Sequence, residues 1–164
     1  MRALIQRVHS ASVEVEGQVI GRIDHGLLVY LGVGLEDGQA DANYLAEKVA
    51  HLRIFQDDAG KMNLSVGDTH GSVLVVPNFT LMADARKGRR PAFVGAAGPD
   101  VAIPLYERFI AAIASAGLPV ERGRFGASMK VHSEAAGPVN IVLDSLPPGG
   151  PCGTGEAAGD PYSP

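Results

Sequence analysis

The sequence predicts one α/β domain in which mixed and antiparallel β-sheets are partly rolled into a barrel against two packed helices. Three observations predict it. Residues 1–145 have the length and apolar content of a single globular unit. Their N-terminal third has strand-like patterns, and two later segments repeat apolar residues at helical spacing. The expected order is strands, helix, strand, helix, strands, so that both helices can pack on one sheet system.

The first strands are expected in the N-terminal third. Residues 3–8 form a strand, and residues 12–16 alternate polar and apolar side chains, as a strand with one wet face does. Gly17 turns that strand into a partner at residues 18–23, which gives a hairpin. Residues 27–31 are continuously apolar, a pattern typical of a strand buried on both faces.

The first helix is predicted over residues 37–52, where the period changes. Its apolar stripe consists of Ala42, Leu45, Ala46, Val49 and Leu52. Residues 72–76 then form another buried strand, which Pro77 ends.

The second helix is expected to begin at an N-cap, Asp100, and to run to residue 115 or 116. Pro104 would lie in its first turn, where a missing N–H costs little, and Gly117 would stop it. Its buried face is predicted to consist of Leu105, Phe109, Ala112, Ile113 and Ala116. Residues 120–125 and 139–143 are the last expected strands.

The remaining residues, 146–164, form a tail rich in Pro and Gly. We expect this tail to be disordered, because it has almost no large apolar side chains. No apolar run approaches the length of a membrane span, and the N-terminus lacks the apolar core of a secretory signal. The single cysteine, Cys152, excludes a disulfide framework. A cytoplasmic protein without membrane association is therefore expected.

The charge of the chain is modest but unevenly distributed. The formal net charge of −4 argues against generic binding to polyanions. Two basic groups stand out, one around Gly88 and a looser one later: Arg86, Lys87, Arg89 and Arg90, then Arg122, Arg124 and Lys130. From charge alone a solvated loop is the favoured interpretation of each group, and contact with phosphates is the functional alternative.

The common catalytic templates are missing from the sequence. It has no G-x-S-x-G turn for a serine nucleophile and no glycine-rich loop for a nucleotide cofactor. The five histidines show no spacing of metal ligands, so neither a metal nor a cofactor is expected. Two acid–histidine pairs, in residues 68–70 and 132–134, are weak candidates because close neighbours in sequence often point apart.

One more specific segment is residues 75–81, where a buried strand runs into Pro77. The backbone N–H groups of the next three residues, Asn78, Phe79 and Thr80, can then point into a cleft. Such groups can stabilise the oxyanion of an acyl-transfer transition state. Without further information, an ordinary strand end with an Asn–Thr turn is the simpler interpretation.

The second specific segment is residues 135–140. Gly137 and Pro138 form a turn of restricted backbone geometry that leads into a strand. Their carbonyl groups can be held outward as rigid acceptors for an amine, although an ordinary turn explains the dipeptide too. The other Gly-Pro pair, at positions 98 and 99, is interpreted as the lead into a helix.

With these two segments, the sequence resembles the D-aminoacyl-tRNA deacylase family. The likeness covers nearly all of residues 1–145 and consists of many short matches in order. They are residues 3–8, 11–13, 26–29, 53–55, 60–64, 71–76, 79–81, 88–93 and 123–127, Met129, and residues 137–139.

The resemblance implies an enzyme that hydrolyses the ester between a D-amino acid and the 3′-terminal adenosine of tRNA. Family members are homodimers that need no metal or cofactor. It further implies that Gly137 and Pro138, joined by a cis bond, enter the partner's pocket and leave no room for an L side chain. Glycine is not excluded by that device. Phe79 and Thr80, beside Asn78, would form the facing wall, where a backbone N–H holds the scissile carbonyl and the 2′-hydroxyl of tRNA activates water.

The same resemblance gives the basic run at Arg86, Lys87, Arg89 and Arg90 a role at acceptor-stem phosphates. Four positions depart from the family pattern. Pro77 and Asn78 replace Ser-Gln, and the pair at 135–136 is Ala-Ala rather than Asn-Asp. A related group in animals also has Pro at the first of these positions, and it is described as having a trans Gly-Pro bond and relaxed chirality. Two alternatives therefore stay open: a deacylase that accepts some L-aminoacyl-tRNAs, and a catalytically inactive dimeric tRNA-binding homologue.

Overall fold

The centre of the fold is one long strand, β1 (Arg2–Val15), in a computed structural model that describes residues 1–145. One edge of β1 pairs first with β3 (Gly26–Gly32) and then with β2 (Gln18–Ile23). Along the other edge it pairs with β8 (Lys130–Asp144). The strands predicted separately at 3–8 and 12–16 are thus a single strand. The expected disorder of residues 146–164 lies outside the described residues.

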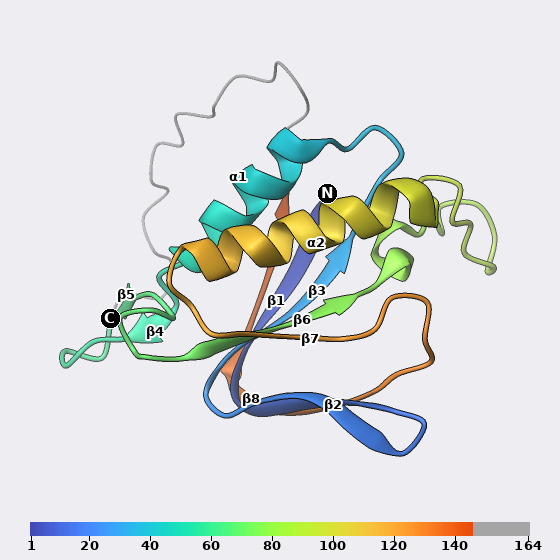
Figure 1. The fold of residues 1–164 in the computed structure, drawn as a ribbon. Coiled ribbons are helices and arrows are strands. Elements are labelled where there is room, and N and C mark those ends of the chain that lie inside the picture. The colour runs from blue at the N-terminus through green and yellow to red at the C-terminus, as the bar shows by residue number, and fades with distance from the viewer. Residues whose placement is uncertain (146–164) are drawn as a thin grey trace.

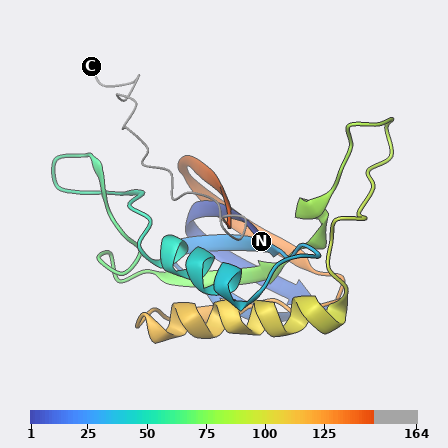
Figure 2. The same cartoon turned by 90° about the horizontal axis from the view of Figure 1, so that it is seen from above.

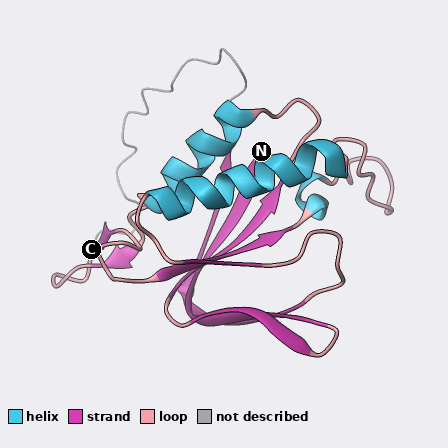
Figure 3. Cartoon of the chain, viewed as in Figure 1, coloured by secondary structure: helices cyan, strands magenta, loops and turns pink. Residues whose placement is uncertain are grey.

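The sheet is mixed. β3 pairs in parallel with β6 (Ser72–Pro77), and β6 pairs in parallel with β7 (Val120–Arg122), whereas every pair made by β1 is antiparallel. The resulting order is β2-β1-β3-β6-β7, with β8 added to β1 (Figures 1 and 3). β3 and β6 are buried on both faces, as their continuous apolar runs predicted.

The sheet curls until it nearly closes. β2 contacts β6 and β7, although it is hydrogen-bonded only to β1. The approach is so close that a Cβ added to Gly21 would lie 3.0 Å from the carbonyl oxygen of Arg122. Inside the curl lies a small apolar core: Val8, Ala11, Val13, Ile23, Leu28, Leu74 and Val76. The predicted α/β domain with a partly rolled sheet is therefore confirmed.

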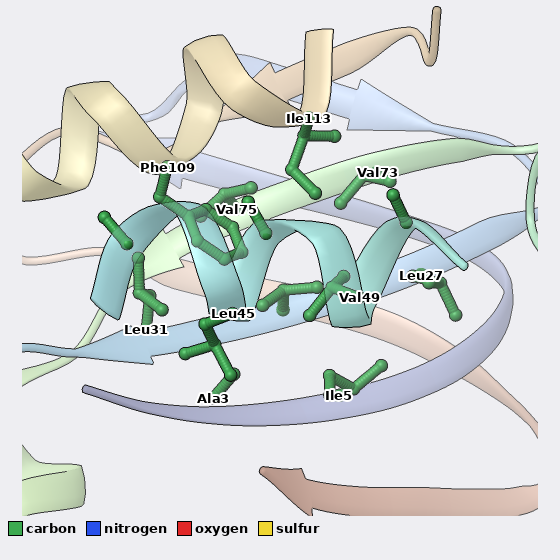
Figure 4. Packing of buried hydrophobic residues seen from close by; sticks show 14 of the residues in the cluster. Ala3, Ile5, Leu27, Leu31, Leu45, Val49, Val73, Val75, Phe109 and Ile113 are labelled. Carbon is green, nitrogen blue, oxygen red and sulfur yellow. The ribbon is translucent and has the colours of Figure 1, made fainter. Parts of the chain in front are cut away.

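Both helices, α1 (Gln39–Ala50) and α2 (Pro99–Ser115), cover the same face of the sheet (Figure 1). They do so because each presents an apolar stripe to the strands. Figure 4 shows Leu45 and Val49 of α1 meeting Phe109 and Ile113 of α2 above the strands. The stripe predicted for α1 is confirmed, with Leu52 packed at the margin of this core.

The start of α2 differs from the prediction. Its N-cap is Gly98, and Pro99 takes the first helical position, where its fixed φ fits and its missing N–H costs nothing. Asp100 therefore lies inside the first turn rather than at the cap, and Pro104 lies beyond the first turn. At the other end, Gly117 stops the helix with φ +84°, as predicted.

The buried face of α2 is also shifted. Leu105, Phe109 and Ile113 are buried as predicted, but Ala116 is exposed and Ala112 only partly buried. Ala102 and Tyr106 are buried instead. Ala102 and Tyr106 lie on the same stripe as Leu105 and Phe109 at helical spacing, and Ala116 is exposed because it is the C-cap residue beyond the last helical position.

Three further differences concern short or polar segments. β7 ends at Arg122 rather than at residue 125, and β8 begins at Lys130, nine residues before the predicted start. A small hairpin of β4 (Phe55–Gln56) and β5 (Met62–Leu64) was not predicted. Seen from above, its loop lies at the opposite end of the molecule from the loop between residues 83 and 97 (Figure 2). None of the helices described is long and apolar enough to cross a membrane.

Candidate active site

The first candidate segment forms a short 3₁₀ turn, η1 (Phe79–Met82), directly after β6. Asn78 caps it. The backbone N–H of Asn78 donates to the Leu31 carbonyl (2.8 Å), which ties the turn to the end of β3. The Asn78 side-chain oxygen accepts from both the backbone N–H of Thr80 (3.1 Å) and the Thr80 hydroxyl. Pro77 ends the strand, and Asn78 then sets the direction of the turn.

These bonds decide which backbone donors are free. All three N–H groups of Asn78, Phe79 and Thr80 were expected to point into a cleft. Two of them are occupied, by Leu31 and by the Asn78 side chain. Within residues 1–145, only the N–H of Phe79 is left without a hydrogen-bond partner among these three. The candidate oxyanion donor is therefore the single N–H of Phe79.

Phe79 and Asn78 line a hollow of about 320 Å³. The other lining residues are Tyr30, Val76, Pro77, Gly126, Ala127, Met129 and Val131. No charged side chain lines it, and burial raises the pKa of Tyr30, so that its phenol stays neutral. The N–H of Phe79 could stabilise a negative charge that develops in this hollow, where no acidic side chain opposes it. A side chain that could act as general base is missing from the hollow.

The second candidate segment is a bulge in β8. Gln6 of β1 pairs with Asn140 and Val8 pairs with Ala135, so Arg7 alone faces the four residues 136–139. The Gly137–Pro138 peptide bond within this bulge is cis, as the resemblance implied. Both residues are exposed, while Ala136 beside them is buried.

Arg7 holds the bulge in place. Its Nε donates to the carbonyl of Ala136 (3.2 Å) and its Nη1 to the carbonyl of Ile54 (2.5 Å). The same guanidinium lies against Gly137, where an added Cβ would come within 3.0 Å of it. Sequence reasoning did not assign Arg7 any role, because β1 contains several other polar and charged side chains and nothing local sets Arg7 apart from them.

The structure does not bring the two candidate segments together within one chain. Gly137 lines a separate hollow of about 440 Å³, together with Arg7, His9, His25 and Phe55. Phe79 and Asn78 do not line that hollow. If these segments act on one substrate, they must come from two copies of the chain.

The basic run lies on the exposed loop that leaves η1. Arg86, Lys87, Arg89 and Arg90 are all exposed there. Arg86 forms an ion pair with Asp84 (2.7 Å), and this guanidinium lowers the pKa of Asp84 to about 2. In the looser group, Arg122 pairs with Glu107 and Lys130 with Glu14.

The weaker candidates gain nothing from the structure. Asp68 accepts hydrogen bonds from the backbone and hydroxyl of Ser65 rather than from His70. His132 and Glu134 line a polar hollow of about 640 Å³ on the face of β1, β2 and β8, with no hydrogen bond between them. In the part of the chain that the structure describes, no three His, Cys, Asp or Glu side chains are grouped as metal ligands would be.

Comparison with known proteins gives a consistent result. A protein named D-aminoacyl-tRNA deacylase from Thermosipho africanus is 54% identical over 145 residues, which cover 88% of this chain and 97% of that protein. One of the same name from Thermus aquaticus is 55% identical, covering 88% and 95%. A solved structure described as c-Myc DNA Unwinding Element Binding Protein is 38% identical, with a TM-score of 0.84, covering 90% of this chain and all of that one. Residues 4–144 match the family described as D-Tyr-tRNA(Tyr) deacylase, and the chain belongs to that family.

Proposed function

We propose that this protein hydrolyses the ester bond of D-aminoacyl-tRNA, and of glycyl-tRNA, to give free amino acid and tRNA. The observation that carries the proposal is identity above 50% to two deacylases over nearly their whole length. The reaction is a proofreading step in translation, and we place it in the cytoplasm. The functional unit is residues 1–145; the family match ends at residue 144, and Ser145 N–H bonds the Met1 carbonyl (2.8 Å).

The chemistry asks little of protein side chains. An aminoacyl ester is already activated, so positioning and stabilisation of negative charge supply most of the rate. In the proposed mechanism the carbonyl oxygen of the ester accepts from the free N–H of Phe79, beside the bonded pair Asn78 and Thr80. Because the hollow offers no general base, the 2′-hydroxyl of the terminal ribose assists the attacking water. No metal or cofactor enters this scheme.

Chirality is selected by Gly137 and Pro138 of a second copy. In this proposal, the carbonyls of these two exposed residues receive the α-amino group and leave no space for an L side chain, which is rejection by steric clash. The support is that both residues stand at the surface on a bulge held by Arg7. This bulge does not line the hollow that Phe79 and Asn78 form in the same chain.

A homodimer is therefore part of the proposal. Both helices of the described residues, 1–145, lie on one face of the sheet and leave its other face without a covering helix (Figure 1). Leu4 pairs in register with Tyr30 on one side and Val142 on the other, and Val142 is 58% exposed. Phe79, 56% exposed, adds to the apolar surface near the site. Exposed apolar area of this kind is typical of subunit contacts.

The second candidate is a dimer that binds nucleic acid without catalysis. It is favoured by the likeness to a structure described as a DNA-element binding protein and by the four departures from the family pattern at positions 77, 78, 135 and 136. A third possibility, relaxed chirality, rests on the same departures. All three keep tRNA or another nucleic acid as the partner.

Incubation with three substrates separates these functions: D-tyrosyl-tRNA, L-tyrosyl-tRNA and glycyl-tRNA. We expect rapid release of D-tyrosine and glycine and retention of the L ester. Release of L-tyrosine at a similar rate would establish relaxed chirality. No release above the buffer rate from any substrate, combined with tRNA binding, would establish the binding protein and overturn the deacylase.

A further inference from the structure

The loop between η1 and α2, residues 83–97, stands away from the body of the molecule as an arm (Figure 2). We call it the basic arm. Its base is closed by two hydrogen bonds of 2.8 Å, from Asp84 N–H to the Ala92 carbonyl and from Ala92 N–H to the Asp84 carbonyl. Further down, the Ala97 N–H donates to the Val33 carbonyl (2.9 Å) at the end of β3. The basic arm is thus a hairpin that is closed between Asp84 and Ala92 and is joined to the end of β3 through Ala97.

The tip of the basic arm carries three cations that have no carboxylate partner within residues 1–145. Arg86 is not one of them, because its guanidinium makes two bonds to Asp84 (2.9 and 2.7 Å) and its N–H a third (2.9 Å). Lys87, Arg89 and Arg90 remain, all exposed and within four positions of one another. Such a group is suited to the phosphates of a nucleic-acid backbone.

The same hairpin touches the candidate wall. Phe93 directly follows Ala92 at the closed base. Its ring packs against that of Phe79 in a T-shaped arrangement, with centroids 5.1 Å apart and planes at 72°. Both rings are partly exposed, Phe79 at 56% and Phe93 at 37%. Phe79 is also the residue whose backbone N–H is free in the candidate site. Because the Phe79 side chain is more exposed than buried, we infer that the edge-to-face contact with Phe93 helps to set the position of its ring.

We propose that the basic arm has two separate roles in the deacylase: tRNA phosphates bind Lys87, Arg89 and Arg90 at its tip, and Phe93 at its base acts as a positioning residue for Phe79. The inference rests on the proposed deacylase function. It assigns the three cations to the affinity for tRNA and Phe93 to the rate of the chemical step, although both parts belong to one hairpin. If Phe93 only held the hairpin together, its loss would disturb tRNA affinity and the chemical step alike.

The test uses two substrates that share the ester and the 2′-hydroxyl. One is D-tyrosyl-tRNA, and the other is 3′-O-(D-tyrosyl)adenosine, which has no phosphate. Replacing Lys87, Arg89 and Arg90 together by Gln should raise KM for the tRNA and lower the slope of log Kd against log salt by about 2 to 3. The same variant should hydrolyse the adenosine ester like the wild type.

Phe93→Ala should lower kcat about three- to tenfold on both substrates, because both depend on the Phe79 wall. The salt slope of tRNA binding should not change. Phe93→Tyr, which keeps the ring contact, should restore kcat. Val94→Ala is the matched control, because Val94 is the next residue of the basic arm and is 80% exposed; it should behave like the wild type.

The role of the tip would be overturned if the triple variant lost the same share of activity on both substrates, or if the salt slope of its tRNA binding were unchanged. A rise in KM without a fall in kcat for Phe93→Ala would overturn the positioning role, as would failure of Phe93→Tyr to restore kcat. These outcomes are distinct from failure of the proposed function itself, in which the wild-type protein would release no D-tyrosine from either substrate.

Discussion

Arg7 reaches across from β1 and donates a hydrogen bond to the carbonyl of Ala136, the residue before the exposed Gly137–Pro138 pair. It is the only residue of β1 opposite the four-residue bulge of β8. Because alanines occupy positions 135 and 136, the bulge has no polar side chains of its own just before Gly137. In this chain, the backbone that we propose as a chirality filter is held by the guanidinium of a neighbouring strand.

Arg7→Ala should therefore loosen the filter. Loss of charge-assisted bonds to Ala136 and Ile54 should lower the free energy of unfolding by about 2 kcal/mol and narrow the ratio of D- to L-tyrosyl-tRNA hydrolysis. Arg7→Lys keeps the charge but cannot bond both carbonyls at once. Its stability and its D/L discrimination should therefore lie between those of the wild type and Arg7→Ala. Chemical denaturation and paired hydrolysis assays measure these effects. A destabilised variant with unchanged discrimination would show that Arg7 supports the fold alone.

Asn78 allows the turn and the chemistry to be separated. Asn78→Asp keeps the oxygen that caps Thr80, so the stability should stay near that of the wild type. The added negative charge beside the N–H of Phe79 should nevertheless lower kcat by at least about tenfold. Asn78→Ala should instead lose about 1 kcal/mol of stability with the cap. Full activity of Asn78→Asp would argue against an oxyanion at Phe79.

Tyr106 links the strands behind the site. The single proton of its buried hydroxyl is shared between the carbonyls of Val75 (2.9 Å) and Gly123 (3.3 Å). Tyr106→Phe should cost about 1 to 2 kcal/mol. Burial raises the pKa of this phenol well above its usual value. A raised folded-state pKa means that its contribution is complete below pH 10 and is lost as the pH rises further.

The pH dependence gives a separate check on Tyr106. Thermal unfolding followed between pH 8 and pH 11 should show the wild type losing stability more steeply than Tyr106→Phe. Tyr30, whose pKa is also raised by burial, should account for part of the slope that remains. Parallel profiles for the two proteins would contradict the buried position of the Tyr106 hydroxyl.

Asp84 should restrain the affinity of the basic arm for tRNA. Its carboxylate stays ionised far below neutral pH, because Arg86 holds its pKa at about 2. Asp84→Asn should release Arg86 as a fourth cation. Binding of deacylated tRNA should then tighten, and its salt slope should steepen by about one. Filter binding at several salt concentrations measures both, with Asp58→Asn, on the other exposed loop, as the matched charge control.

Much of the fold follows from local patterns. The two helices carry clear helical periodicity and the buried strands β3 and β6 are continuous apolar runs, and each is found where its pattern predicted it. The strand pattern failed over residues 130–138, a stretch rich in polar and small residues. This stretch is a strand because β1 offers it a whole edge for pairing, and such long-range pairing leaves little local signal. The two-residue strand β4 is too short to show any period.

The site was less predictable than the fold. The residues next to Pro77 were rightly expected to leave the sheet, and η1 does begin there. Which N–H stays free could not be foreseen, because it depends on the Asn78 side chain turning back to Thr80 and on Leu31 from another strand. The contact of Phe93 with Phe79 could not be foreseen either, because these residues meet only when the basic arm folds back on itself.

Mixing two impaired variants tests whether each active pocket needs two chains. Asn78→Asp damages the wall, and Gly137→Val damages the filter, since even a Cβ at Gly137 would lie 2.9 Å from Val139. Each variant alone should hydrolyse D-tyrosyl-tRNA at least about tenfold more slowly than the wild type. After dissociation and random reassociation, about one quarter of all pockets would combine two intact parts, as expected for a two-fold dimer. Recovery of about that share of wild-type activity is expected, and no recovery in mixed dimers of confirmed composition would contradict a pocket built from both chains.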